Sequence, residues 1–273
     1  MTASVTTSVL INADQTTVWK FLSEQQRVLG WMTYMPGAPA PAGSVFEARP
    51  GGALRIIFPN GGEAKGKVLE VRPPERLVFT WGYAPDVAKT GLGPGACRVE
   101  ISVRRVEDGS GGGGGGGGTL VTLTHSGPMS EALAQGHLAG WNHYLSQLAV
   151  QSAMEFHQSH LGATLENYFN AWSEADAGKR DALLAGCCEP NVRFRSAFAC
   201  TETRADMSAH IANGLAHMPG MRLQQDGIAR HMHGVARVPW KVAGPDGKAA
   251  FRGENIVRFT PSGLISELIS FPA

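Results

Sequence analysis

Basic residues are not in excess in this 273-residue chain, because 24 lysines and arginines are balanced by 23 aspartates and glutamates. The two halves of the chain are each close to charge balance as well. Binding to nucleic acid depends on neutralising phosphates, and binding to anionic lipid depends on polybasic segments. We therefore expect neither nucleic acid nor a membrane surface as a partner.

Long apolar runs are also lacking. No stretch approaches the roughly 20 consecutive apolar residues that a membrane-spanning helix needs. The N-terminal segment MTASV has neither the basic region nor the apolar core of a secretory signal. The expectation is a cytoplasmic protein.

Cysteine is scarce, and its spacing argues against metal binding. The four cysteines contain no CxxC pair, and two of them, Cys187 and Cys188, are adjacent on a segment that reads as an amphipathic helix. Buried, reduced thiols are the simplest interpretation. The sequence indicates no metal site and no cofactor.

The first half of the chain predicts a strand, a short helix, a meander and a long helix. Asp14 is placed to cap the short helix, and the meander strands are joined by Gly, Pro and Asn turns too short for parallel crossovers. From residue 129 to about 156 the apolar period becomes helical. The predicted strands are residues 4–11, 44–48, 53–58, 64–71, 77–82, 97–106 and 119–125.

The second half places its helices first and most of its strands last. Helices are expected at residues 163–175, 179–187 and from residue 203 to the MPG turn at 218–220, with a short strand at residues 192–197. Four strands then end the chain, at residues 221–231, 235–242, 249–260 and 264–271. Such a meander would curl into a cone with an open mouth.

The glycine run at residues 111–118 is the most conspicuous local feature, and it suggests a phosphate-binding loop. A phosphate loop needs a strand before the glycines and a helix after them. This run instead joins two predicted strands. We therefore expect a flexible, poorly ordered hairpin tip.

Several motifs of the first half resemble the AHSA1-like branch of the START/SRPBCC superfamily. They are VLEVRPPERLVFTW at residues 68–81, LTHSG at 123–127 and HLAGW at 137–141, preceded by INA at 11–13, VW at 18–19 and WM at 31–32. The resemblance covers nearly all of residues 1–150. It implies a helix-grip fold with a cavity between the long helix and the sheet.

The second half resembles the SnoaL-like branch of the NTF2-like superfamily. The motifs are YFNAW at residues 168–172, NVRF at 191–194, MPG at 218–220 and GENIV at 253–257, in the expected order. The predicted fold class is thus α+β: a helix-grip antiparallel sheet with a long C-terminal helix, followed by an α+β cone-shaped curved-sheet domain. The predicted domains are residues 1–157 and 163–273.

Candidate ligand-binding residues in the first domain are aromatic side chains and histidines. His137 and Trp141 share a helix face, and Trp81 ends a strand that should lie beneath that helix. Such side chains line cavities for flat apolar ligands, although aromatic stripes at helical spacing also simply fill cores. The candidates are Trp31, Trp81, His125, His137, Trp141 and Tyr144.

In the second domain the resemblance implies an acid or histidine base in an apolar pocket. Asn255 and Ser270 stand where many relatives carry acidic residues, and an amide and a hydroxyl are poor bases. His231 and His217 remain as candidate acid/base residues, with hydrogen bonding as the alternative role for each. Further candidate ligand contacts are Trp172, Arg230, Trp240, Asn255 and Ser270.

Three functions are compatible with these observations. The first is binding of a small apolar, polyketide-like or aromatic metabolite in one or both domain cavities. The second is a cyclase, dehydratase or isomerase reaction in the C-terminal pocket. The third is an Hsp90-type co-chaperone module, which the AHSA1 resemblance implies. A homodimer formed through the C-terminal domain sheet is also expected from the second resemblance.

Overall fold

The computed structural model describes residues 2–32, 40–58, 61–84, 91–107 and 117–273. The contacts divide the chain into two compact units, the first ending at Ser152 and the second beginning at Ala153. The division falls within one helix, α4 (Glu131–Ala171), which contributes residues to both units. The sequence places the boundary near residues 157–162, inside or just after the long helix, and these residues lie further along α4.

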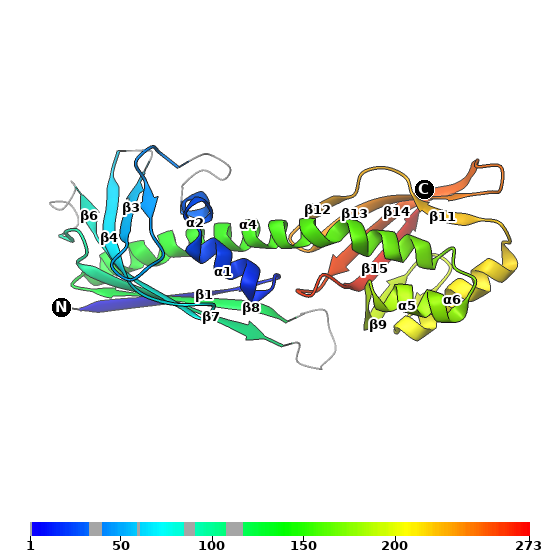
Figure 1. Ribbon diagram of the computed structural model, residues 1–273, viewed down its shortest axis with the longest axis horizontal. Coiled ribbons are helices and arrows are strands. Elements are labelled where there is room, and N and C mark those ends of the chain that lie inside the picture. The colour runs from blue at the N-terminus through cyan, green and yellow to red at the C-terminus, as the bar shows by residue number, and fades with distance from the viewer. Residues whose placement is uncertain (1, 33–39, 59–60, 85–90, 108–116) are drawn as a thin grey trace. The chain divides into compact units, whose positions relative to one another are not determined.

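Eight strands form the sheet of the first unit, in the order β1-β8-β7-β5-β4-β3-β2, with β6 paired to β4. Every pairing in this sheet is antiparallel, as the short connections predict. Helices α1 (Gln15–Ser23) and α2 (Gln25–Trp31) follow the first strand (Figure 1). The strands are β1 (Ala3–Ile11), β2 (Val45–Phe46), β3 (Ala53–Ile57), β4 (Glu63–Arg72), β5 (Arg76–Trp81), β6 (Tyr83–Ala84), β7 (Cys97–Val106) and β8 (Gly118–Gly127).

Alternating burial shows which face of this sheet forms the core. Every second residue is buried on β7 from Cys97 to Val103 and on β8 from Val121 to His125. Because side chains alternate between the faces of a strand, His125 points into the core together with its apolar neighbours. The part of the glycine run from residue 111 to 116, predicted to be a hairpin tip, lies outside the described residues.

Helix α4 is continuous, where the sequence analysis predicted two separate helices at residues 129–156 and 163–175. That prediction was wrong because the buried positions continue through the supposed break, at Phe156, His157 and Leu161, with helical spacing. Gly162 lowers helix propensity by only about 1 kcal/mol relative to alanine. No proline interrupts the segment.

The second unit contains a seven-stranded sheet in the order β10-β9-β15-β14-β13-β11, with β12 paired to β13. The β15–β9 pair is parallel and was not predicted, whereas β11, β13, β14 and β15 pair antiparallel as expected. The elements after α4 are α5 (Ala177–Ala185), β9 (Cys188–Arg195), β10 (Cys200–Thr201), α6 (Arg204–His217), β11 (Arg222–Gln225), β12 (Arg230–Met232), β13 (Val235–Ala243), β14 (Ala249–Phe259) and β15 (Ile265–Pro272).

Two further predictions for this unit need correction. The single strand predicted at residues 221–231 is divided into β11 and β12, and Gly227 between them has φ of 134°, a left-handed conformation that favours glycine. Cys187 and Cys188 are not helical, because α5 ends at Ala185 and Cys188 begins β9. The helix is therefore shorter than the predicted residues 179–187 at its C-terminal end.

The predicted α+β fold class is confirmed: an antiparallel sheet with a long helix is followed by a second mixed helix-and-sheet unit. Within the described ranges, none of the helices combines the length and the apolar character needed to cross a bilayer.

Candidate functional site

Seven side chains of the first unit, six of them buried and Tyr83 half-buried, form an aromatic–histidine cluster where α4 faces the sheet. Four of the predicted ligand-binding residues meet directly: the ring centroids of Trp81 and Trp141 are 5.2 Å apart, and those of His125 and His137 are 4.4 Å apart. Tyr144 packs edge-on to Trp141. The cluster comprises Trp81 at the end of β5, Tyr83 at the start of β6, His125 on β8, Met129 before α4, and His137, Trp141 and Tyr144 on α4.

Hydrogen bonds determine the proton position on each histidine. Trp141 Nε1 donates to His125 Nδ1 at 2.9 Å, and an indole nitrogen can only donate. Neutral His125 therefore carries its proton on Nε2. His137 Nδ1 lies 3.4 Å from Met129 Sδ, which can only accept, so the Tyr83 hydroxyl donates to His137 Nε2 at 2.9 Å.

Both histidines are uncharged at neutral pH. Burial, reinforced by the neighbouring His137, lowers the pKa of His125 from 6.5 to about 3. Burial alone lowers the pKa of His137. The cluster therefore presents an apolar, uncharged environment with fixed hydrogen-bond directions.

Two buried N–H groups of the cluster have no acceptor in the described part of the chain. They are His125 Nε2 and Trp81 Nε1, on residues that are 0% and 3% exposed. A buried donor left unpaired costs about 1–3 kcal/mol. Both groups are donors, so the acceptor that would satisfy them is an atom that carries a lone pair.

Trp31, the sixth candidate of the first unit, lies in the core beside α1. Its Nε1 donates to the carbonyl oxygen of Phe21 at 2.7 Å. This bond satisfies the indole nitrogen within the protein. The role of Trp31 in the structure is therefore packing and hydrogen bonding between α2 and α1.

Sequence reasoning missed two members of the cluster, Tyr83 and Met129. Tyr83 follows Trp81 by two residues, the spacing that places side chains on one face of a strand, so the alternation rule could have found it. Met129 precedes the helix and has no periodic signal. Its contact with His137 depends on the path of the chain between β8 and α4.

The predicted acid/base residues of the second unit do not line either of the two recesses described there. His217 ends α6 in an exposed position, and its Nδ1 lies 2.9 Å from the carbonyl oxygen of Asn213. His231 Nε2 accepts from the backbone N–H of Gly234 at 2.9 Å, which closes the turn after β12. Burial lowers the pKa of His231, with a further contribution from His233. Arg230 is exposed on β12.

Of the other candidates in the second unit, Asn255 and Trp240 are buried, and Trp172 and Ser270 are half-buried. Asn255 is buried on β14 and opposite Ser270 on β15, while Trp240 is buried on β13. Trp172 packs against Phe194 and His210, at 5.7 and 5.8 Å between ring centroids. Sequence reasoning missed His210, although it precedes the buried Ile211 on α6; burial lowers its pKa.

The buried polar atoms of the second unit that lack a hydrogen-bond partner include both donors and an acceptor. Trp172 Nε1 and Trp240 Nε1 are donors, and Asn255 Oδ1 is an acceptor. Tyr168 lies beside Trp172 and Asn255, and its pKa is raised, first by burial and then by the neighbouring Cys188. No carboxylate is among these buried groups.

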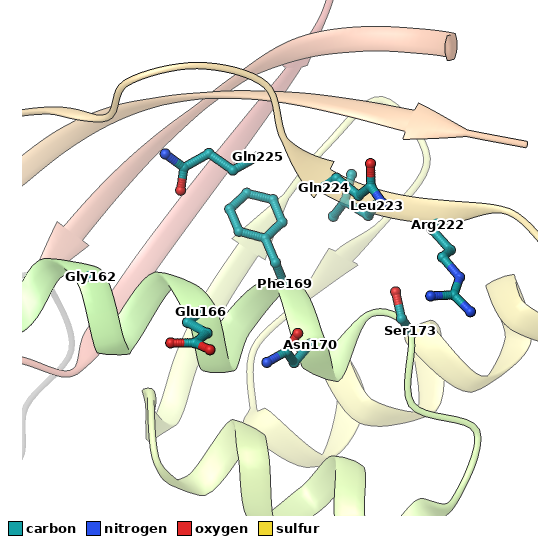
Figure 2. Close-up of a pocket in the computed structure, with 9 residues that line it drawn as sticks. All are labelled: Gly162, Glu166, Phe169, Asn170, Ser173, Arg222, Leu223, Gln224 and Gln225. Carbon is teal, nitrogen blue, oxygen red and sulfur yellow. The ribbon is translucent and has the colours of Figure 1, made fainter. Parts of the chain in front are cut away.

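Two recesses open on the second unit. One is an apolar recess of about 80 Å³ between α6, the residue that follows α4, and the sheet. It is lined by Trp172, Ile211, Gly214, Leu215, Met218, Met221, Leu223 and Val242. The other is a polar groove of about 320 Å³ between α4 and β11. Figure 2 shows Phe169 between these two elements, with Glu166 and Arg222 toward opposite ends of the groove.

Metal binding finds no support in the described residues, where histidine, cysteine and carboxylate side chains form no group of three that could hold an ion. All four cysteines are free thiols. Cys187 Sγ and Cys188 Sγ are 3.6 Å apart and buried. Their surroundings raise the pKa of Cys188, the hydrogen bond with Cys187 being the main cause.

Residues 12–152 match the family described as Activator of Hsp90 ATPase homolog 1-like protein, abbreviated AHSA1. No match was found among curated proteins. Solved structures with partial likeness include a SnoaL-like family protein from Agrobacterium tumefaciens, which is 24% identical over 42% of this chain and 98% of its own, with a TM-score of 0.40.

Two other solved structures have similar scores. A protein from Mesorhizobium loti is 20% identical over 54% of this chain and 94% of its own, with a TM-score of 0.40. A protein with a cystatin-like fold from Methylobium petroleophilum is 20% identical over 42% of this chain and 76% of its own, with a TM-score of 0.36. At these scores the likeness carries no inference about activity.

Proposed function

We propose that this chain, which belongs to the AHSA1 family, binds a small planar apolar molecule at the aromatic–histidine cluster of its first unit. The observation that carries the proposal is the pair of uncharged, buried histidines in contact at 4.4 Å. An apolar residue at either position would avoid the cost of removing an imidazole from water. Polar groups retained at such a cost are candidates for a functional site.

The chemistry of the cluster supports a flat, uncharged ligand. Aromatic rings favour offset or edge contacts with another ring, and the cluster supplies indole, phenol and imidazole rings. Tyr83 is half-buried and lies on the two-residue strand β6, so its rotation is the simplest way to admit a ligand. The histidines would orient the ligand through hydrogen bonds rather than through charge.

The apolar recess of the second unit is a weaker candidate for the same function. Trp172 lines this recess together with aliphatic side chains, and this apolar lining supports a second small-molecule contact. The recess volume of about 80 Å³ is smaller than the engineered cavity of about 150 Å³ that holds benzene. A ligand there would project from the surface.

Binding of naphthalene tests the proposal in the first unit. We expect saturable binding in calorimetric titration, and weaker binding by at least roughly 10-fold in Trp141→Ala, because the central ring of the cluster is lost. Trp240→Ala is the matched control, since Trp240 is a similarly buried tryptophan of the second unit. The Trp240→Ala variant should bind naphthalene with the same affinity as the unmodified protein.

A direct readout keeps the test independent of variant folding. On addition of naphthalene to the full chain, the imidazole NMR signals of His125 and His137 should shift, and those of the exposed His217 should not. The proposal is wrong if naphthalene does not bind, or if it binds without moving the signals of His125 and His137.

A further inference from the structure

We infer that the ligand of the aromatic–histidine cluster carries a neutral, carbonyl-type oxygen that accepts hydrogen bonds from His125 Nε2 and Trp81 Nε1. This inference rests on the proposed function and specifies the ligand class. Its basis is the hydrogen-bond inventory of the cluster, which leaves two buried donors without a partner and no unpartnered buried acceptor among these seven residues.

The donor character of His125 Nε2 follows from its bonded partner. Trp141 Nε1 occupies His125 Nδ1 at 2.9 Å and can only donate, so Nδ1 is the unprotonated nitrogen. His137 cannot receive the remaining proton, because its Nε2 and Nδ1 are occupied by Tyr83 and Met129. The free N–H of His125 therefore requires an acceptor that these contacts do not provide.

Trp81 and His125 project from the same face of the sheet. Trp81 pairs with Cys97 on β7, while His125 pairs with Val99, two residues along the same strand. Both side chains contact the ring of Trp141, at centroid distances of 5.2 and 6.0 Å. A flat molecule lying against Trp141 would thus be bordered by both donors.

The surroundings favour a neutral oxygen over a carboxylate. The ring contacts and the side-chain hydrogen bond recorded for His125 and Trp81 in the described chain are with uncharged side chains: Phe79, Tyr83, His137 and Trp141. Burying a carboxylate without a cation is strongly unfavourable. Ketones, quinones, esters and amides have the required lone pairs without the charge.

The test compares 1-tetralone with tetralin, which has the same two-ring skeleton without the carbonyl. Affinities of both are measured on the full chain and on Trp81→Phe. Because a hydrogen bond contributes about 1 kcal/mol, the substitution should weaken binding of tetralone by roughly 5- to 10-fold more than that of tetralin. Trp31→Phe is the matched control, because its indole N–H is already bonded to Phe21. Trp31→Phe should change the affinities for tetralone and tetralin by the same factor.

Two spectroscopic readouts do not depend on stability. The carbonyl stretch of bound tetralone should lie at lower frequency than that of tetralone in hydrocarbon, and Trp81→Phe should reverse part of the shift. The proton on His125 Nε2 should move downfield with tetralone and not with tetralin.

The possible results distinguish failure of the proposed ligand binding from failure of the inference about the ligand oxygen. If both ligands bind and Trp81→Phe weakens them equally, the oxygen inference is wrong and the proposed function stands; a structural water would then be the partner of the two donors. If neither ligand binds, both are wrong. Tighter binding of 1-naphthoate than of tetralone would also overturn the inference, since it would require a cationic site.

Discussion

The aromatic–histidine cluster of the first unit and the interior of the second unit differ in how their buried polar groups are arranged. In the first unit the histidines of the cluster are held by Trp141, Tyr83 and Met129, and the unpartnered atoms of the cluster are donors only. In the second unit, buried donors on Trp172 and Trp240 coexist with a buried acceptor on Asn255.

This difference indicates whether the cluster or the second interior has the greater need of an external acceptor. A set containing donors and an acceptor can be satisfied by rotation of its own side chains or by a bridging water. A set of donors alone needs a lone pair from outside the set, supplied either by a ligand or by a water. The first unit is therefore the stronger candidate for ligand binding, even though both recesses described on the surface belong to the second.

The largest expected effect is a loss of stability that is restricted to the second unit. A Cβ on Gly253 would lie 2.4 Å from the Trp240 ring and 2.2 Å from the carbonyl oxygen of Phe271. Gly253→Ala should therefore lower the free energy of unfolding of this unit by about 3 kcal/mol. Denaturant unfolding measures the change. Naphthalene affinity should be unchanged, and a loss of it would show that the two interiors are not independent.

The next effect is a pH dependence that originates in the first unit. Because the pKa of folded His125 is about 3 against an ordinary value of 6.5, its contribution to stability is complete above pH 6.5 and is lost as the pH falls toward 3. From about pH 7 to pH 5 the loss should be about 2 kcal/mol.

The measurement is the free energy of unfolding of the full chain against pH. His125→Gln retains an acceptor for Trp141 and should remove this part of the pH dependence, whereas His217→Gln, at an exposed site, should not. Equal pH profiles for the unmodified protein and His125→Gln would contradict the assignment of a neutral buried His125.

A smaller difference in stability is expected between removing an indole N–H that is hydrogen-bonded and removing one that is not. Trp141→Phe removes the donor to His125, while Trp240→Phe removes an N–H that has no partner. Both tryptophans are buried, so the losses of volume are comparable. Trp141→Phe should be more destabilising by about 1 kcal/mol, measured by denaturant unfolding. If Trp240→Phe lowers the free energy of unfolding more than Trp141→Phe does, the proposed difference between the two interiors is wrong.

The smallest effect concerns the helix shared by the two units. Nothing lies within 4 Å of a Cβ added to Gly162 on α4. Gly162→Ala should therefore raise the free energy of unfolding by roughly 0.5–1 kcal/mol through helix propensity. If the helix were broken near this position, as the sequence suggested, the substitution would have little effect on thermal unfolding.

The sequence predicted the sheet of the first unit well because its strands follow a strict two-residue alternation. The same alternation carries His125 into the core at the end of β8, and helical spacing brings His137 and Trp141 to one side of α4. These local periods suffice to assemble most of the cluster. They do not give the contacts of Tyr83 and Met129, which depend on chain reversals.

Long-range pairing was the main feature that could not be predicted. The parallel pairing of β15 with β9 joins segments far apart in sequence, and no local pattern specifies it. The roles of His217 and His231 were equally inaccessible, because a histidine beside a turn has the same sequence signature whether it caps the turn or lines a pocket. Only the position of Gly234 shows that His231 closes its turn.

The most direct test of the account is the protonation of His125, observed by nitrogen NMR of histidine-labelled protein at pH 7 with and without 1-tetralone. The account predicts a neutral ring protonated on Nε2 in both states, with the Nε2 proton shifting when tetralone binds. A ring protonated on Nδ1, a charged ring, or an Nε2 proton unaffected by bound tetralone would contradict it.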